Sequence, residues 1–321
     1  MSVFACALPE ETMLHLRGGA IPAFLQGQLS CDTRKLSTTQ AVPGALCNVK
    51  GRVISDVMVV QVSDSHCLLR LRRSMADRCR EVLSRYAQFS RIAVETAAAG
   101  DRIVGIYTMH PDQQLGEAVI PEGANPFSVS IEEDALILHR SPTQLEIIMF
   151  GDVQRAQNML RRFAIEEGSA ADWDYAVLRA GHYAINPDDS EVYTPQALNY
   201  DLSGRVAFDK GCYTGQEVIA RLHYKGRSKR RLQIYTPQPT SDGDNAVLST
   251  QPEGALPGAQ LYLSDGTAVG TLLRCERHSS GALAFAAEVL EEHREAPLTL
   301  ESGTIFEPEM CAPKAAPEAK P

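Results

Sequence analysis

The sequence lacks any apolar run long enough to cross a membrane, and its N-terminus lacks the features of a secretory signal. Residues 1–11, MSVFACALPEE, carry acidic residues where a signal peptide would need a basic region and a longer apolar stretch. We therefore expect a protein of the cytoplasm, neither secreted nor inserted in a membrane.

Metal-binding cysteine patterns are also missing. The chain has 8 cysteines, but no CxxC pair and no Cys/His cluster with zinc spacing. Their spacing indicates no disulfide framework either, which is typical of free thiols in a reducing compartment. We predict no metal site.

Positive charge is scarce as well. Lys and Arg number 31 against 40 Asp and Glu, giving a formal net charge of -9. Affinity for polyphosphate depends largely on clustered Lys and Arg, so a general nucleic-acid coat is disfavoured. Only a local basic patch could bind a polyanion.

What is present is a globular composition, with 44% hydrophobic residues and a mixture of strand and helix signals. β-Branched and apolar runs predict strands, and apolar residues at helical spacing predict helices. The predicted strands are 53–62, 66–72, 102–107, 135–139 and 145–150, and the predicted helices are 75–86 and 153–163. This mixture, without strict alternation, predicts an α+β fold.

The composition and hydrophobic pattern of the sequence change along the chain. Residues 111–130, rich in proline and without periodicity, read as a surface insertion. Short strand candidates at 260–263 and 268–274 flank a Ser-Asp-Gly-Thr hairpin signal and indicate a small β domain. We predict an α+β region of two subdomains over 1–231, a β domain over 232–307 and a disordered tail over 308–321.

The stretch KGCYTGQE, residues 210–217, contains a candidate reactive thiol. Thr214 and Glu217 have the spacing of a capping box, which predicts a helix starting at Thr214 with Cys212 just outside its positive end. The helix terminus and the nearby Lys210 would both favour the thiolate. The alternative is that Cys212 is a small hydrophobic residue packed under a turn.

The most basic stretch follows at 221–231, RLHYKGRSKRR. It can be a solvated linker between domains, or a cradle for phosphates or a polycarboxylate. Charge alone does not separate these ligands.

Three stretches place glycine, amide and acidic groups beside short apolar runs: FLQGQLSCD (24–32), CNVKGRVISDVMV (47–59) and TPQALNYDLSGRVAFDKGCYTGQE (194–217). That composition suits a pocket of backbone donors and side-chain acceptors, although turns share it. Together and in this order, the stretches resemble the YgfZ group of folate-binding proteins, relatives of the glycine cleavage T-protein, an aminomethyltransferase. The resemblance runs from Phe24 to at least Leu232, and KGCYTGQE followed by AR and KGRSKRRL is its most specific element.

The resemblance implies a fold of three subdomains in a ring, with a tetrahydrofolate site toward the centre and a C-terminal β-barrel. It implies a role in the assembly or repair of iron-sulfur proteins and, through an iron-sulfur enzyme, in tRNA thiomethylation. The expected partners are therefore folate and iron-sulfur proteins or their assembly machinery, with tRNA reached only indirectly. We expect a monomer.

The candidate site residues combine this resemblance with side-chain chemistry. Carboxylates and amides can accept hydrogen bonds from a pterin, and cations can hold the glutamate tail of folate or another anion. The predicted folate-binding residues are Asp32, Asn48, Asp56, Gln216 and Glu217, the predicted anion-binding residues are Lys210, Arg221, Lys225 and Arg227, and Cys212 is the predicted reactive thiol. Gln216 and Glu217 could also hold the Cys212 turn. Cys31 and Cys47 lie in the other two stretches and could approach Cys212.

The chain departs from the T-protein at two positions. Ser55 replaces one acid of a paired Asp-Asp, and Arg179 stands where the T-protein has an acid in a Leu-Glu-Ala-Gly stretch. An Arg cannot accept a hydrogen bond from a pterin, and the T-protein has no counterpart of Cys212. We therefore expect no aminomethyl transfer. A folate-dependent one-carbon transferase and an RNA-binding module stay as the alternative functions.

Overall fold

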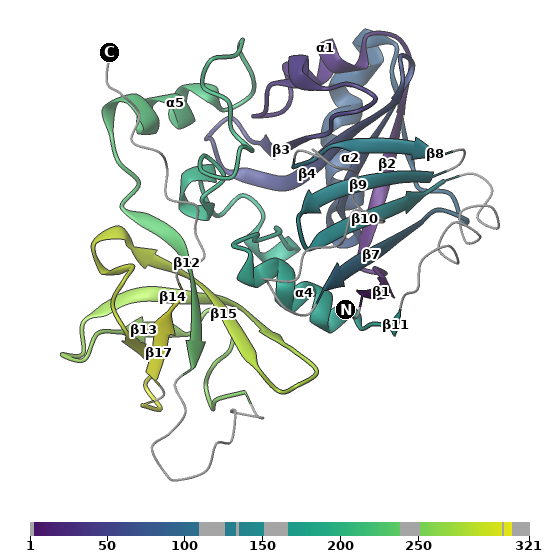
Figure 1. The fold of residues 1–321 in the computed structure, drawn as a ribbon. Helices are drawn as coiled ribbons and strands as arrows, with labels where there is room; N and C mark the ends of the chain where they lie inside the picture. The colour runs from purple at the N-terminus through teal and green to yellow at the C-terminus, as the bar shows by residue number, and fades with distance from the viewer. Residues whose placement is uncertain are drawn as a thin grey trace. The chain divides into compact units, whose positions relative to one another are not determined.

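The structure is a computed structural model that describes residues 3–108, 126–132, 135–150, 166–237, 251–303 and 305–309 (Figure 1). The chain forms two compact units. The first unit comprises Met1–Ala170, Ala184–Tyr193 and Gly204–Ala220, and the second comprises Ala171–Tyr183, Thr194–Ser203 and Arg221–Pro321. Within the described ranges, no helix has both the length and the apolar character needed to span a membrane.

The first unit contains a five-stranded antiparallel sheet with the strand order β3-β4-β5-β2-β6. Its strands are β2 (Glu11–Arg17), β3 (Val42–Cys47), β4 (Val53–Ser63), β5 (His66–Arg72) and β6 (Ala93–Thr96). Helix α2 (Ala76–Ala87) packs on β2 and β6. Its buried residues Cys79, Leu83 and Ala87 follow one another at four-residue spacing, so they lie on one face of the helix.

A second sheet of the first unit has six strands in the order β11-β1-β7-β10-β9-β8. They are β1 (Val3–Ala7), β7 (Arg102–Thr108), β8 (Val129–Glu132), β9 (Ala135–Ser141), β10 (Gln144–Met149) and β11 (Glu166–Glu167). Alternate residues in β7, β9 and β10, among them Ile106, Ile137 and Ile147, enter one apolar cluster, in keeping with the two-residue period of a strand.

Short helical segments connect these strands. They are α1 (Ile21–Gln26), η1 (Thr33–Lys35), η2 (Arg73–Met75), η3 (Gln88–Ser90) and η4 (Pro187–Asp189). Helix α5 (Gln216–Lys225) starts in the first unit, and its residues from Arg221 onward belong to the second. Of the stretches picked out from the sequence, 24–32 runs from α1 into the loop before η1, whereas most of 47–59 lies in β4.

The second unit contains a closed barrel with the strand order β12-β15-β14-β13-β16-β17. Its strands are β12 (Arg230–Pro237), β13 (Gln260–Tyr262), β14 (Ala268–Arg277), β15 (Leu283–Leu290), β16 (Leu298–Thr299) and β17 (Ile305–Pro308). Pairing of β12 with both β15 and β17 closes the barrel, so neither side of β12 is left as a free edge. Phe285 and Phe306 meet edge to face inside it, with ring centroids 4.7 Å apart.

The second unit also contains short helices among its described residues. It holds α4 (Ala170–Arg179), η5 (Pro195–Leu198) and η6 (Glu291–His293); Ala170 itself is counted with the first unit. The α+β class and the C-terminal β-barrel predicted from the sequence are confirmed.

Some boundaries differ from the predicted ones. The barrel strands extend from Arg230 to Pro308, slightly beyond the predicted limits of 232 and 307, and β8 occupies the end of the predicted insertion at 111–130. The predicted helix at 153–163, residues 111–125 of the insertion and residues 310–321 of the predicted tail lie outside the described residues.

Candidate functional site

The Lys210 side chain joins two of the three stretches picked out from the sequence. Its ammonium donates to three backbone carbonyls: Gln26 O at 2.8 Å, Leu29 O at 2.6 Å and Cys31 O at 2.6 Å. An ammonium has three N–H donors, so each has an acceptor here. The turn that carries Cys212 is therefore fixed to the loop after α1.

This arrangement gives Lys210 a different role from the predicted anion ligand. The residue is buried, and its ammonium lies 4.7 Å from the centroid of the Tyr213 ring, a cation–π distance. Burial lowers the pKa of Lys210 to about 8, against the opposing effects of Cys31 and Asp32. Because its donors are committed to carbonyls, the side chain holds the turn rather than an external anion.

The third stretch meets the same turn through two glycines. Gly215 has φ +83°, and a Cβ added to it would lie 2.4 Å from Asn48 O. Gly51 has φ +67°, and its Cβ would lie 3.0 Å from Val218 in α5. Only glycine tolerates both the positive φ and such close approach without strain. The tip of the β3–β4 hairpin thus packs directly against the start of α5.

Cys212 is exposed on this turn, whereas Cys31 and Cys47 are buried. Burial raises the pKa of both buried thiols to about 12, so they are protonated near neutral pH. Among the described residues, no group of three or more His, Cys, Asp or Glu side chains could hold a metal ion. The three cysteines therefore do not form a ligand set within the described chain.

The helix begins later than the sequence pattern predicted. α5 starts at Gln216, not at Thr214, and residues 214–215 form a turn. Cys212 is thus four residues ahead of the helix, and the field of a helix terminus falls off within the first turn. The physical reason is Gly215, whose positive φ is incompatible with an α-helical residue.

Asp32 is saturated by internal hydrogen bonds. It caps η1 by accepting from the Arg34 backbone N–H, and it accepts from the Arg34 guanidinium at 2.8 and 2.9 Å and from Gln26 Nε2 at 3.0 Å. The bonds from Arg34 hold the pKa of this carboxyl well below its usual range, although burial opposes the shift. Asp32 shapes the loop that receives Lys210.

Asn48 likewise serves the fold. Its Oδ1 accepts from the backbone N–H groups of Lys50 and Arg52 at 2.9 and 3.0 Å, and its Nδ2 donates to Glu191 Oε2 at 2.8 Å. The side chain therefore builds the tip of the β3–β4 hairpin, with both acceptor bonds of Oδ1 and one of the two Nδ2 donors used inside the fold.

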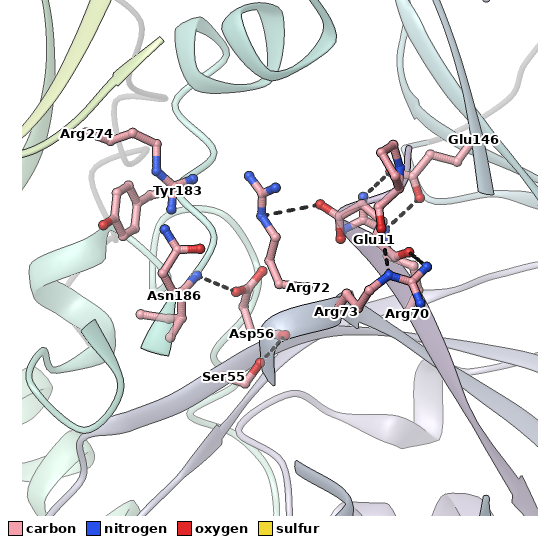
Figure 2. A network of polar contacts seen from close by, with 12 residues as sticks. Glu11, Ser55, Asp56, Arg70, Arg72, Arg73, Glu146, Tyr183, Asn186 and Arg274 are labelled. Carbon is pink, nitrogen blue, oxygen red and sulfur yellow. Dashed lines mark hydrogen bonds and ion pairs between the residues drawn. The ribbon is translucent and has the colours of Figure 1, made fainter. Parts of the chain in front are cut away.

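Asp56 is the predicted pocket residue with spare hydrogen-bonding capacity. It lies on β4, largely buried, and its Oδ1 accepts from the Ile185 backbone N–H at 2.9 Å. No other described residue donates to this carboxylate. The neighbouring Ser55 hydroxyl donates to the Asp56 carbonyl oxygen at 2.9 Å, so it is turned toward the backbone (Figure 2).

A buried network of charges near Asp56 was not predicted from the sequence. Arg70 donates to Glu146 Oε2 at 2.9 Å and Oε1 at 2.6 Å and pairs with Glu11 at 2.9 Å (Figure 2). Arg140 donates to Glu146 Oε1 at 2.6 Å. Burial alone would raise the pKa of Glu146, but Arg70 and Arg140 lower it overall. The Asp56 charge also acts on Arg70.

This network ties the two sheets of the first unit together. Glu11 and Arg70 belong to the first sheet, and Arg140 and Glu146 belong to the second. The signal in the sequence was a charged residue within an apolar strand, as in HCLLRLR and QLEIIM. Such a residue at an alternate position reads as the solvent face of a strand, which is why the network was missed.

The remaining predicted residues line α5 and the segment after it. Gln216 is half-buried at the first position of the helix, and Glu217 is exposed in its first turn. Arg221, Lys225 and Arg227 are exposed, and none of them forms an ion pair with another described residue. These three are available to an external anion.

Comparison with known proteins identifies relatives of this chain by sequence. The chain is 30% identical over 231 residues to the tRNA-modifying protein YgfZ of Yersinia enterocolitica, covering 70% of this chain and 68% of that protein. It is 27% identical over 243 residues to the tRNA-modifying protein YgfZ of Vibrio atlanticus, covering 71% and 70%. No protein-family profile matches the chain.

Among solved structures, the fold is similar to that of the glycine cleavage system aminomethyltransferase T from Bartonella henselae. The TM-score is 0.73 at 17% sequence identity, covering 97% of this chain and 86% of that one. This likeness confirms the T-protein-like fold expected from the sequence. The identity and coverage of the sequence match go further, and the chain belongs to the family of the tRNA-modifying protein YgfZ.

Proposed function

We propose that this protein binds tetrahydrofolate and assists the assembly or repair of iron-sulfur proteins, and thereby tRNA modification by thiomethylation. The observation that carries the proposal is the exposed Cys212 on a turn fixed by Lys210, in a chain of the YgfZ family. The names of its relatives as tRNA-modifying proteins and the T-protein-like fold support a folate-related role in tRNA modification.

Asp56 is the best-supported residue for the folate side of the proposal. A pterin presents amino and ring N–H donors, and a largely buried carboxylate with one oxygen not engaged by a described residue is a matching acceptor. Asp32 and Asn48 would act indirectly, by holding the loops around the site. Gln216 and Glu217 stay in the proposal as residues at the start of α5.

The basic end of α5 would hold the acidic tail of the cofactor. Arg221 and Lys225 are four residues apart on one helix, so they share a face, and Arg227 follows directly after the helix. Several exposed cations without acidic partners form a site for a chain of glutamate carboxylates. Lys210 is excluded from this group because its ammonium is internally bonded.

Cys212 would be the reactive group in the assembly or repair of iron-sulfur proteins. It is an exposed thiol, whereas Cys31 and Cys47 are buried and kept protonated by burial. One thiol cannot hold a cluster alone, so the cluster would belong to the client protein as substrate. Cys212 would contribute a single sulfur ligand or nucleophile.

Aminomethyl transfer is disfavoured by two positions. The Ser55 hydroxyl donates to a backbone carbonyl, and Arg179 forms a two-point ion pair with Glu309 at 3.1 and 2.9 Å. Neither side chain offers the carboxylate that the T-protein has at the corresponding position. We therefore expect no glycine-cleavage turnover from this chain.

Calorimetric titration of tetrahydrofolate into the purified full chain tests the folate proposal. Wild type should bind, and Asp56→Asn should bind about tenfold or more weakly because a hydrogen bond to a charged acceptor is lost. The control Asp77→Asn, at an exposed carboxylate of α2, should bind like wild type. Absence of binding at millimolar tetrahydrofolate would end the proposal.

The anion site is tested with triglutamylated and monoglutamylated tetrahydrofolate. Replacing Arg221, Lys225 and Arg227 together by Gln should weaken the triglutamate more than the monoglutamate, because the cations meet the tail and not the pterin. The control replaces Arg80 and Arg85, exposed on α2, by Gln and should change neither affinity. Equal losses for both ligands would show that the segment serves another purpose.

The thiol is tested in cells that lack their own copy of the gene. Cys212→Ser should fold normally but fail to restore iron-sulfur enzyme activity and tRNA thiomethylation, while Cys275→Ser in the barrel should restore both. Full restoration by a stable Cys212→Ser protein would remove the thiol from the mechanism and leave the folate proposal standing.

A further inference from the structure

The tip of the β3–β4 hairpin carries an apolar side chain in water. Val49 is 79% exposed and stands between Asn48 and Lys50 in the turn. Asn48 Oδ1 makes hydrogen bonds of the turn, accepting from the Lys50 and Arg52 backbone N–H groups, so the geometry of the turn does not call for a valine. A single exposed apolar residue is common on protein surfaces, so its neighbours decide whether it marks a site.

A second exposed valine belongs to the same part of the first unit. Val192 is 47% exposed, and two hydrogen bonds join its segment to the hairpin. Arg52 donates to Val192 O at 2.7 Å, and Asn48 Nδ2 donates to the preceding residue, Glu191, at 2.8 Å. The two valines therefore stand next to residues that are bonded directly to one another.

The backbone at Glu191 holds this arrangement against its local preference. Glu191 has φ 65°, a left-handed conformation that costs free energy for a residue with a Cβ. Its backbone N–H donates to Val53 O at 2.7 Å, and its carboxylate pairs with Arg78 at 2.8 Å. Backbone strain persists only where the surroundings enforce it, and it is concentrated at functional sites. The position of Val192 beside the hairpin is thus a candidate functional feature.

Two cations accompany the valines. Lys50 and Arg52 are exposed, and neither forms an ion pair with another described residue. The acidic neighbour, Glu191, is already paired with Arg78, and the chain as a whole carries a formal net charge of -9. The hairpin tip is therefore positive in a chain that is acidic elsewhere. We call this group the tip surface, and its members are Val49, Lys50, Arg52 and Val192.

This combination fits a protein partner better than a nucleic acid. Binding of a polyphosphate needs many cations, and binding of unpaired bases needs aromatic side chains, whereas the tip surface has two cations and two valines. An apolar contact inside a polar rim is usual for protein interfaces. The complementary partner would present an apolar contact among carboxylates.

The tip surface lies close to the exposed thiol. Gly215 packs against Asn48 O, and Cys212 precedes Gly215 by three residues, which span at most about 11 Å. A partner on the tip surface would therefore have its own surface beside Cys212. We propose that the tip surface is the docking site for the acidic surface of an iron-sulfur client protein. The inference rests on the proposed function and names the contact that brings a client to Cys212.

The test is the affinity between the purified full chain and a purified iron-sulfur enzyme that thiomethylates tRNA, measured by fluorescence anisotropy. Val49→Asp places a carboxylate at the apolar contact and Lys50→Glu reverses one cation, so each should weaken binding about tenfold or more. Added sodium chloride should weaken wild type more than Lys50→Glu, because the variant has lost one attraction. The control Phe89→Asp changes another exposed apolar residue of the first unit and should bind like wild type.

Further readouts separate this inference from the proposed function. Val49→Asp and Lys50→Glu should keep wild-type tetrahydrofolate affinity and near wild-type alkylation of Cys212 by iodoacetamide, yet restore less thiomethylation in cells that lack the gene. Wild-type affinity of both variants for the enzyme, or a wild-type chain that restores thiomethylation without binding the enzyme, would overturn the docking site alone. A wild-type chain that neither binds the enzyme nor restores thiomethylation would end the proposed function as well.

Free tRNA is the competing probe for the same surface. It should bind wild type, Val49→Asp and Lys50→Glu equally weakly, because the tip surface has too few cations for a polyphosphate. Loss of tRNA binding in both variants with unchanged enzyme binding would assign the tip surface to RNA and contradict the inference.

Discussion

At the scale of single residues, Lys210 gives the clearest case of a side chain whose role depends on partners distant in sequence. Its position two residues before Cys212 suggested a cation that would favour a thiolate. The structure instead directs the ammonium to three carbonyls in the 26–31 loop, more than 170 residues away. Sequence spacing cannot reveal such partners, because backbone carbonyls leave no residue-type signal.

Removal of this ammonium should destabilise the first unit strongly. Lys210→Met leaves three buried carbonyls without a donor, and we expect a loss of about 3 kcal/mol or more in the free energy of unfolding. Lys225→Met, at an exposed lysine, should change it by less than about 0.5 kcal/mol. Urea unfolding measures both, and a Lys210→Met protein as stable as Lys225→Met would contradict the role assigned here.

A second residue-scale feature is a buried hydrogen-bonded chain of Asp101, His15 and His66. His15 Nε2 lies 2.8 Å from Asp101 Oδ2, and His15 Nδ1 lies 3.0 Å from His66 Nε2. Burial lowers the pKa of His66 to about 4, helped by Arg17 and His15 and opposed by Glu95 and Asp101. His66 is therefore neutral in the folded protein at neutral pH.

This lowered pKa predicts how stability changes in acid. The unfolded chain protonates His66 near its usual pKa of about 6.5, whereas the folded protein resists until about 4. The contribution of neutral His66 is thus fully present above about pH 6.5 and is lost as the pH falls toward 4, on the order of 2 kcal/mol in all. Stability measured against pH should fall less steeply in His66→Gln than in wild type, and parallel curves would refute the assignment.

At the scale of elements, local sequence patterns were sufficient to predict strands and helices where buried residues recur at a regular spacing. The predicted strands at 53–62 and 66–72 match β4 and β5, and the predicted helix at 75–86 matches α2, because each has a clear apolar period. Strand β2 and helix α1 gave no such signal, since β2 is buried at nearly every position and α1 has only six residues. The start of α5 was wrong for a different reason.

The T-x-x-E spacing of Thr214 and Glu217 is a genuine helix-start pattern, but it describes only four residues of chain. Gly215 has a positive φ that the close approach of Asn48 O requires, and this tertiary contact overrides the local pattern. The sequence singled out three stretches, and the structure brings parts of all three together at the Cys212 turn, whereas the role of Asp56 in binding stays a prediction. The charge network was not predictable, because it forms between two sheets.

Two glycines of similar backbone conformation allow this close approach to be measured. Gly215→Ala combines a positive φ with a Cβ 2.4 Å from Asn48 O, whereas Gly204→Ala has φ +76° but open space around its Cβ. Both should lose about 1 kcal/mol from the backbone alone, and Gly215→Ala should lose about 2 kcal/mol more from overlap. Equal losses in thermal or urea unfolding would mean that the hairpin tip and α5 adapt freely.

At the scale of the whole molecule, a buried charge network connects the two sheets of the first unit. Glu146 is fully buried and receives hydrogen bonds from both Arg70 and Arg140. A buried ion pair adds little net stability compared with apolar packing, but loss of one partner leaves the others charged and uncompensated. We therefore expect the network to specify how the two sheets pair more than to add net stability.

Glu146→Gln should accordingly cost about 3 kcal/mol or more in the free energy of unfolding, because two buried guanidiniums lose their shared carboxylate. The control is Glu95→Gln, which removes one partner of the exposed pair with Arg17 and should cost less than about 1 kcal/mol. Measurement by urea unfolding at neutral pH compares them. Similar small losses would mean that the network is dispensable.

The three carbonyls around Lys210 also have a consequence for the ions that the protein could require. Oxygen atoms converging on one ammonium form a cup of the kind that binds free monovalent cations, and here the cation is tethered to the chain. The native protein is thereby independent of the ionic composition of its surroundings at this point. Lys210→Ala would remove the tethered ammonium and leave the three carbonyls without a cation. The stability of this variant should then rise with ammonium or potassium in the buffer, and sodium or lithium at equal ionic strength should raise it less.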